Sequence, residues 1–311
     1  MKQESFALDS NLPYTLAFVA YRLPGTDSPD YAATRVMADV LASQRGDLYA
    51  LVPAGKALYA SFELAETYPK ASVGFGIAAL PASTAPTGVV ADMRSIVANY
   101  VREGFPAELV EAAKRSEVAS ALFRRNSISD LAAVWSQALA AEGRNSPDDD
   151  VDAIRRVTVA DVNRVATQFL KDANSITATL LPKPTGEAAS GRGFGGGESL
   201  TAAPTKPVKL PEWAEAALSA VRVPAIDPTW TDTTLPNKLR VIVKSDKTSP
   251  TVTLLGNIRH ETTLQEPPGK DGVSDVLDEL FSYGATTLDR IAFQKALDDI
   301  AASERQAMTS R

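Results

Sequence analysis

The sequence predicts an α+β protein in which a mostly antiparallel sheet carries helices packed on one face. Three observations predict this fold class. The elements follow the order strand, helix, two strands, several helices and a last strand; the two middle strands are close enough in sequence to form a hairpin; and apolar residues recur every three or four positions in the helical segments. After a segment rich in Gly and Pro, a partial second copy of the same plan begins.

The first predicted elements are a strand, a helix and a hairpin. Residues 12–22 (LPYTLAFVAYR) are rich in aromatic and aliphatic side chains, as in a buried strand. Residues 30–43 have apolar side chains at the i, i+3, i+4, i+7 and i+8 spacing of one helical face. Residues 58–64 and 71–80 alternate or run apolar over strand length, and the turn at 66–70 joins them into a hairpin.

Several helices and a closing strand follow the hairpin. The helical segments have apolar stripes or helix-start residues, and they cover 87–103, 107–125, 128–141, 148–156 and 158–170. Thr158 stands three residues before Asp161, as in a capping box. The aspartates at 148–150 suit a helix N-terminus, and we interpret them as helix-start residues rather than as a metal site. Residues 175–181 (SITATLL) close the unit as a strand.

The rest of the chain is predicted to be a linker and an incomplete second domain, which divides the protein into residues 1–182, 183–232 and 233–311. Gly, Pro, Ser, Thr and Ala dominate the linker, and a short helix is predicted near its end. Predicted elements after residue 210 are helices at 211–221, 272–282 and 288–303 and strands at 239–244 and 251–259. Because two strands leave open sheet edges, we expect this second domain to be truncated or completed by a partner.

Composition argues against several classes of function. A net charge of -6 disfavours nucleic acid as a partner, since nucleic-acid binding depends on Lys and Arg. No apolar run approaches the roughly 18 to 20 residues of a membrane helix, so no membrane span is predicted. The chain has no Cys and a single His, His260. Zinc sites are built from Cys, His and carboxylate side chains, and nucleophilic triads need a His or a Cys, so most familiar hydrolase chemistry is excluded from this chain alone. We expect His260 to be a solvated polar residue.

Taken together, these stretches resemble the M16 (insulinase or pitrilysin-like) metallopeptidase family. Residues 13–182 are similar to the C-terminal, non-zinc domain of one M16 half, in the strand YTLAFVAYRLPG, the helix YAATRVMADVLAS, the segment GDLYALVPAGKALYASF and the late helix TVADVNRVATQFL. Residues 234–304 are similar to the start of the next half, where TLPNKLRVIV resembles the opening strand. The resemblance implies an M16-like fold in both parts, and its likeness to large bacterial members with a Gly-rich linker implies a periplasmic or secreted protein.

In this family, the segment matching LQEPPGKDGVSDVLDELFSYGATT carries an inverted H-x-x-E-H zinc motif, whose helical spacing places both imidazoles and the catalytic carboxylate on one face. Here Asp275 and Glu279 stand at the His positions and Asp278 at the Glu position. The resemblance therefore implies a degenerate motif, no zinc or other cofactor in this chain, and zinc in the complete enzyme or a partner. The three carboxylates leave two interpretations open: a solvated helix face, or a site for Ca²⁺ or Mg²⁺.

The family's non-zinc domain often supplies an Arg and a Tyr, seven residues apart, that hold the substrate carbonyl near the zinc. Tyr59 matches the Tyr position, whereas Val52 stands at the Arg position. The resemblance thus makes Tyr59 a candidate contact to the substrate or its oxyanion. Packing in the core or in a cavity wall is the other role open to it.

Two functions follow from the resemblance. In the first, the chain is part of a zinc-dependent M16-type peptidase that degrades or processes peptides; it supplies chamber wall and substrate contacts, while the zinc site lies outside it. In the alternative, it is a natural non-catalytic subunit that binds a separate zinc-bearing chain. The expected partners are a peptide substrate and either the remaining M16 domains or that partner chain. A glycosidase with two carboxylates is disfavoured, because the carboxylate cluster lies along one helix and cannot straddle a sugar.

Overall fold

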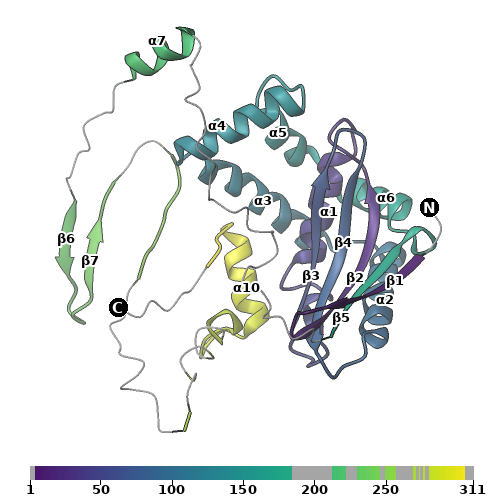
Figure 1. The fold of residues 1–311 in the computed structure, drawn as a ribbon. Helices are drawn as coiled ribbons and strands as arrows, with labels where there is room; N and C mark the ends of the chain where they lie inside the picture. Colours follow the sequence, from purple (N-terminus) through teal and green to yellow (C-terminus); the bar gives the residue numbers. More distant parts are fainter. Residues whose placement is uncertain are drawn as a thin grey trace. The chain divides into compact units, whose positions relative to one another are not determined.

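Figure 1 shows the computed structural model of the chain, in which the described residues are 4–183, 212–221, 230–245, 249–256, 269–270, 273, 276 and 280–304. The chain divides into two compact units. One unit combines Met1–Glu187 with Ser249–Arg311, and the other is Ala188–Thr248. The division at residues 182 and 232 that the sequence suggests stays a prediction.

The first unit is built on a five-stranded sheet with the strand order β1-β5-β2-β4-β3 (Figure 1). Its strands are β1 (Glu4–Ser10), β2 (Tyr14–Leu23), β3 (Tyr59–Thr67), β4 (Ser72–Pro81) and β5 (Ile176–Pro182). The pairs β2–β4, β3–β4 and β2–β5 are antiparallel, whereas β1 runs parallel to β5. The predicted hairpin and the mostly antiparallel sheet are therefore confirmed.

Six α-helices accompany this sheet between β2 and β5, and all the helices predicted there are confirmed. They are α1 (Tyr31–Ala42), α2 (Thr87–Glu103), α3 (Ala107–Arg124), α4 (Ile128–Ser136), α5 (Asp148–Arg156) and α6 (Val159–Phe169). Short turns of other helix types are η1 (Tyr49–Leu51) and η3 (Asp172–Asn174), both 3-10, and the π-helical η2 (Gln137–Ala141), which continues α4. The predicted capping box forms: the Asp161 N–H donates to the Thr158 hydroxyl at 3.2 Å, and the Thr158 N–H donates to the Asp161 carboxylate at 3.1 Å.

Helices and sheet bury one common core. From the strands, Val19, Tyr21 and Leu80 turn into it, and α1 lies at its centre because Val36 and Met37 are completely buried. Helix α1 contacts β3, α3, α5 and α6, while α2 and α6 contact β2. Side chains alternate along a strand, so residues next to these core positions turn to the other face of the sheet.

That other face, which we call the open face, is also largely apolar. The strand register forms one row across the sheet from Leu8, Leu180, Leu16, Ala79 and Tyr59. The next row consists of Phe6, Ala178, Phe18, Ile77 and Ser61. Leu16 and Ile77 are buried among their neighbours, yet neither belongs to the core cluster. Nearer the sheet edges, Phe6, Leu8 and Tyr59 are 49%, 57% and 45% exposed.

Strand β1 is an element that the sequence analysis did not predict. Its residues are exposed apart from the partly buried Ser10, so the strand has no face that packs into the core. Without a buried face, the alternation of Phe6 and Leu8 with smaller residues is too short a signal to recognise. The strand is held by its parallel ladder with β5, which pairs Glu4 with Ile176 and Ser10 with Pro182.

The part of the chain after the Gly- and Pro-rich segment contains fewer elements. The second unit holds α7 (Glu212–Ala220) and the antiparallel pair β6 (Thr231–Thr234) and β7 (Arg240–Val243). The first unit holds η4 (Phe281–Tyr283) and α10 (Arg290–Asp299). The predicted helices at 211–221 and 288–303 and the strand at 239–244 are thus confirmed, whereas β6 was not predicted.

The strand predicted at 251–259 is wrong over the part that the structure describes. Residues 251–256 belong to no strand, and Val252, Leu254 and Leu255 are 87%, 93% and 86% exposed. An apolar run becomes a strand only when a ladder partner satisfies its backbone, and the described residues supply none here. Most of the helix predicted at 272–282 lies outside the described residues.

Candidate functional site

Tyr59 is the first residue of the edge strand β3 and projects from the open face of the sheet. Its position is fixed by the turn before it: the Ala57 N–H donates to the Leu51 carbonyl at 3.2 Å, and the Leu58 N–H already donates to Ala79 at 2.8 Å. Ala60, the next residue, is buried on the core side. Tyr59 must therefore face the opposite way, because side chains alternate along a strand.

The Tyr59 hydroxyl lies beside one carboxylate. It donates to the Glu63 Oε1 atom at 3.5 Å, the longest separation that still counts as a hydrogen bond. Glu63 lies four residues further along the same strand, on the same face. A phenol has one proton to donate, so an incoming carbonyl oxygen would compete with Glu63 for this hydrogen bond.

The open face gives Tyr59 an apolar setting. Rings of Phe18 and Phe75 meet edge to face there, with centroids 5.6 Å apart. The row that ends at Tyr59 is otherwise made of Leu and Ala side chains. The apolar side chains of this face are exposed near the sheet edges, at Phe6, Leu8 and Tyr59, and buried at Leu16 and Ile77 between them.

Val52, at the position matching the family's Arg, is apolar and packs against the core cluster. Its N–H donates to the Tyr49 carbonyl at 2.9 Å, which places Val52 in the turn that follows η1. The nearby cation Lys56 pairs with Asp92 at 2.7 Å. Tyr59 is thus brought to an accessible surface without an arginine from the matching position.

The degenerate zinc-motif residues Asp275, Asp278 and Glu279 lie outside the described residues, as does His260. Within the described ranges, no group of three or more His, Cys, Asp or Glu side chains is arranged to hold a metal ion. The donor set of the motif itself consists of carboxylates, which does not fit the imidazole ligation of the family's zinc. None of the described helices is long and apolar enough to cross a membrane.

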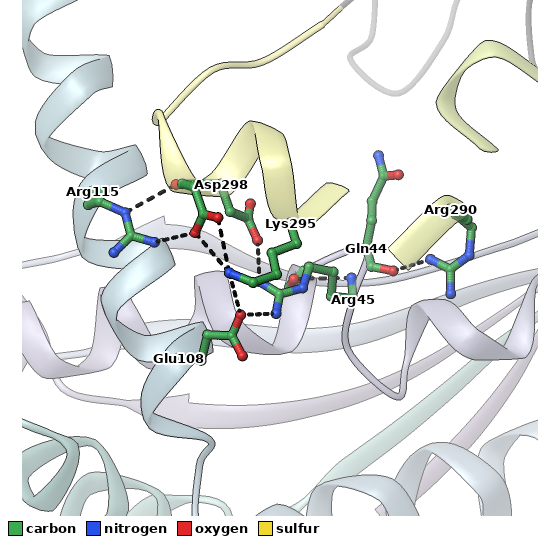
Figure 2. Close-up of polar contacts among 9 residues, drawn as sticks. Gln44, Arg45, Glu108, Arg115, Arg290, Lys295 and Asp298 are labelled. Carbon is green, nitrogen blue, oxygen red and sulfur yellow. Dashed lines mark hydrogen bonds and ion pairs between the residues drawn. The ribbon is translucent and has the colours of Figure 1, made fainter. Parts of the chain in front are cut away.

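Helix α10, which follows the motif segment, is held against α1 and α3 by charged side chains (Figure 2). Arg45, three residues after α1, has a side chain only 9% exposed and pairs with Glu108 at 2.6 Å and with Asp298 at 2.8 Å. Lys295 also reaches Glu108, at 3.1 Å. The Arg115 Nε–H donates to the Asp298 carbonyl oxygen at 3.1 Å. Polar contacts therefore link α10 to α3 and to the residues that follow α1.

The charges of this network support one another. Burial acts to lower the pKa of Arg45, but its hydrogen bonds to Asp298 and Glu108 outweigh burial and the pKa is raised. The pKa of Glu108 is lowered, first by the hydrogen bond from Lys295 and then by that from Arg45. Both pKa shifts favour the charged forms of Arg45 and Glu108.

No family model and no curated protein matches this chain. Solved structures do match. A protease from Helicobacter pylori superposes with a TM-score of 0.53 at 18% identity, over 58% of this chain and 45% of that chain. A protein from Alicyclobacillus acidocaldarius named as an M16-like peptidase gives 0.51 at 15% identity, over 58% and 44%.

A further structure carries the name of the inactive peptidase domain of a zinc protease from Bordetella parapertussis. It gives a TM-score of 0.49 at 20% identity, over 55% of this chain and 93% of that chain. This chain spans less than half the length of the H. pylori and A. acidocaldarius proteins. At these identities, the likeness establishes the fold alone.

Proposed function

The chain has an M16-like peptidase fold, and from that premise we propose that it is part of a zinc-dependent M16-type peptidase that degrades or processes peptides, with the zinc site outside this chain. In this proposal it supplies chamber wall and substrate contacts. The zinc belongs to the remaining M16 domains of the same protein. Support comes from Asp275 and Glu279, which stand where the resemblance expects the two imidazole ligands.

The observation that carries the proposal is Tyr59 on the open face. A side chain that only filled the core would be buried, whereas Tyr59 is 45% exposed, and among the described residues its hydroxyl makes one long hydrogen bond, to Glu63. The hydroxyl can therefore turn to a substrate carbonyl without breaking a strong contact. In the proposed peptidase, it donates a hydrogen bond where negative charge develops on that oxygen.

The strand that carries Tyr59 also offers a way to align a peptide. Among the described strands, β3 pairs with β4 alone, so one side of β3 is a sheet edge. An extended peptide can add to such an edge as a further strand, through main-chain hydrogen bonds that do not depend on its sequence. A peptide bound along β3 would pass Tyr59 at the beginning of the strand.

The proposal is tested by Tyr59→Phe in the complete, zinc-bearing protein. The substitution keeps the ring and removes the hydroxyl, so we expect turnover of a peptide substrate to fall about tenfold to a thousandfold, as for other oxyanion donors. Tyr14→Phe is a matched control, because Tyr14 begins β2 and lies on the same face. It should leave turnover unchanged. Equal turnover in wild type and Tyr59→Phe would make Tyr59 a packing residue and contradict its proposed role.

The alternative function is a natural non-catalytic subunit that pairs with a separate zinc-bearing chain. Mass spectrometry of the protein purified from its native source separates the two. Peptides with an H-x-x-E-H motif in the same polypeptide support the single peptidase. A native mass near 33 kDa together with a co-purifying H-x-x-E-H chain supports the subunit. Under either function we propose a periplasmic or secreted location, and an export signal in the native gene would support it.

A further inference from the structure

A cavity of about 460 Å³ lies among α3, α4, η2 and α5. Its lining contains no strand residue, so it is separate from Tyr59 and the open face. A volume of this size falls within the range of small-molecule sites, roughly 300 to 1,000 Å³. Small side chains help to leave the space open, among them Ala121, Ala133 and Ala138.

The wall formed by α4 is unusually apolar for its exposure. The helix carries a single charged residue, Asp130, and none of its side chains is buried. Leu131 and Trp135 line the cavity and are both exposed. The lining also includes Val118 of α3 and the buried Ile154 of α5. The exposed apolar side chains of Leu131 and Trp135 favour an apolar ligand that covers them.

The polar side of the cavity is an ion-pair network whose carboxylates are all occupied. Arg35 pairs with Asp150 at 2.6 Å and also with Glu117. Arg144 pairs with Glu142 at 2.8 Å and also with Asp150. The remaining carboxylate of the lining, Asp148, pairs with Arg125. A cationic ligand would compete with the pairs of Arg35 and Arg144, whose side chains and partners are only 12% to 24% exposed; the Arg125–Asp148 pair is more exposed, at 45% and 61%.

Arg124 differs from the other three arginines of the cavity. It lies in the last turn of α3 and lines the cavity, yet it forms no ion pair within the part of the chain that the structure describes. Arg124 is an exposed residue, so a carboxylate can approach it without losing much water. Arginine binds carboxylates through two parallel hydrogen bonds, which adds geometric preference to the charge. The cavity can therefore accept one anionic group without disturbing any existing pair.

From this arrangement we propose that the cavity is a binding site for an aliphatic carboxylate of the fatty-acid class. The carboxylate pairs with Arg124 at the rim, and the hydrocarbon chain lies against Leu131, Trp135 and Val118. The π-helical turn η2 contributes to the same cavity through Gln137 and Ala138. Such turns are frequent at functional sites. The proposal does not depend on a peptidase function or on zinc.

The test is calorimetric titration of the full chain with decanoate below its micellar concentration. We expect saturable binding at one site. Decyltrimethylammonium has the same chain length and the opposite charge, and it should not bind saturably. Binding of the ammonium compound as tightly as decanoate, or the absence of saturable decanoate binding, would overturn the proposal.

Two variants locate the site. Arg124→Gln should weaken decanoate binding about fivefold to tenfold, since it removes the charge-assisted hydrogen bonds. Arg102→Gln is the matched control, because Arg102 is an exposed arginine in the last turn of α2, where it contacts Asn99 and Glu103. Ala121→Phe should abolish binding by filling the cavity, provided that circular dichroism shows a folded protein. Unchanged affinity in Arg124→Gln would assign decanoate to another surface and refute the site.

Discussion

Tyr59 faces solvent because Ala60 faces the core, and this alternation is the clearest link between sequence and candidate site. The resemblance alone left two roles open for Tyr59, a contact to the substrate or packing in the protein. Its exposure depends on the register that pairs Tyr59 with Ala79 and on which face of the sheet the helices cover. The register cannot be derived from the strand sequence alone, although Ala60, Phe62 and Leu64 form an apolar face and Ser61 and Glu63 lie on the face of Tyr59.

Asp39, on α1, is a second residue whose environment was invisible in the sequence. Burial, followed by the negative charge of Glu117, raises the pKa of Asp39 well above its usual value, although Arg35 opposes the shift. In the sequence, Asp39 falls on the polar face of the predicted amphipathic helix, where a charged residue is ordinary. The contact with Glu117 joins positions 78 apart in the chain, which no local pattern can reveal.

The raised pKa of Asp39 predicts a pH dependence of stability. The folded state holds the Asp39 proton more tightly than the unfolded chain, so this contribution is present at low pH and is lost as pH rises toward the folded-state pKa. Asp39→Asn removes the titrating group but keeps a hydrogen-bond donor for Glu117. In scanning calorimetry, the melting temperature of the variant minus that of wild type should therefore be higher at pH 8 than at pH 4.

The control for this experiment is Asp27→Asn, in an exposed loop position. Its melting temperature relative to wild type should stay nearly constant between the two pH values. A constant difference for Asp39→Asn as well would show that Asp39 does not titrate differently in the folded and unfolded states.

At the scale of elements, the two strands that the sequence analysis missed, β1 and β6, are exposed along almost their whole length. Helix α1 and strands β2 and β4 have strong apolar patterns because each turns one side to the core. Strand β1 has no such side and was missed. The strand prediction at 251–256 is wrong for the opposite reason. Its apolar residues suggested a strand, but a strand also needs a partner for its backbone hydrogen bonds.

Docking of α10 provides a prediction at this scale. Asp298 and Asp299 lie at the C-terminal end of the helix, where the macrodipole disfavours anions. Arg45 and Arg115 compensate for them, so α10 should depend on its contact with the first domain. Arg45→Gln should speed hydrogen exchange of the α10 amides, equivalent to a loss of about 1–2 kcal/mol in local stability.

Salt provides the complementary measurement. Raising the ionic strength should speed the exchange of α10 in wild type, because the outer pairs of the network are partly exposed and therefore screened. Arg102→Gln should leave the hydrogen exchange of α10 unchanged, because the Arg102 side chain donates to Asn99 and Glu103 of its own helix. Protection of α10 that is unaffected by both Arg45→Gln and salt would show that apolar contacts hold the helix instead.

At the scale of the whole molecule, the M16-like fold accounts for 58% of the chain, and this portion corresponds to less than half of the H. pylori and A. acidocaldarius structures. Stretches of the sequence suggested the M16-like fold, although no family model and no curated protein matches. In our proposal, peptide cleavage is a property of the complete assembly rather than of this chain. In this proposal, the chain is a framework that carries Tyr59, and the zinc site lies in another part of the assembly.

The central claim is that this chain is inactive alone and leaves zinc to other parts of the assembly. The most direct measurement is the zinc content of the isolated chain after incubation with zinc and dialysis, together with cleavage of a fluorogenic peptide library by the same sample. We predict no stoichiometric zinc and no cleavage above the level without protein. One zinc per chain accompanied by chelator-sensitive cleavage would contradict the account.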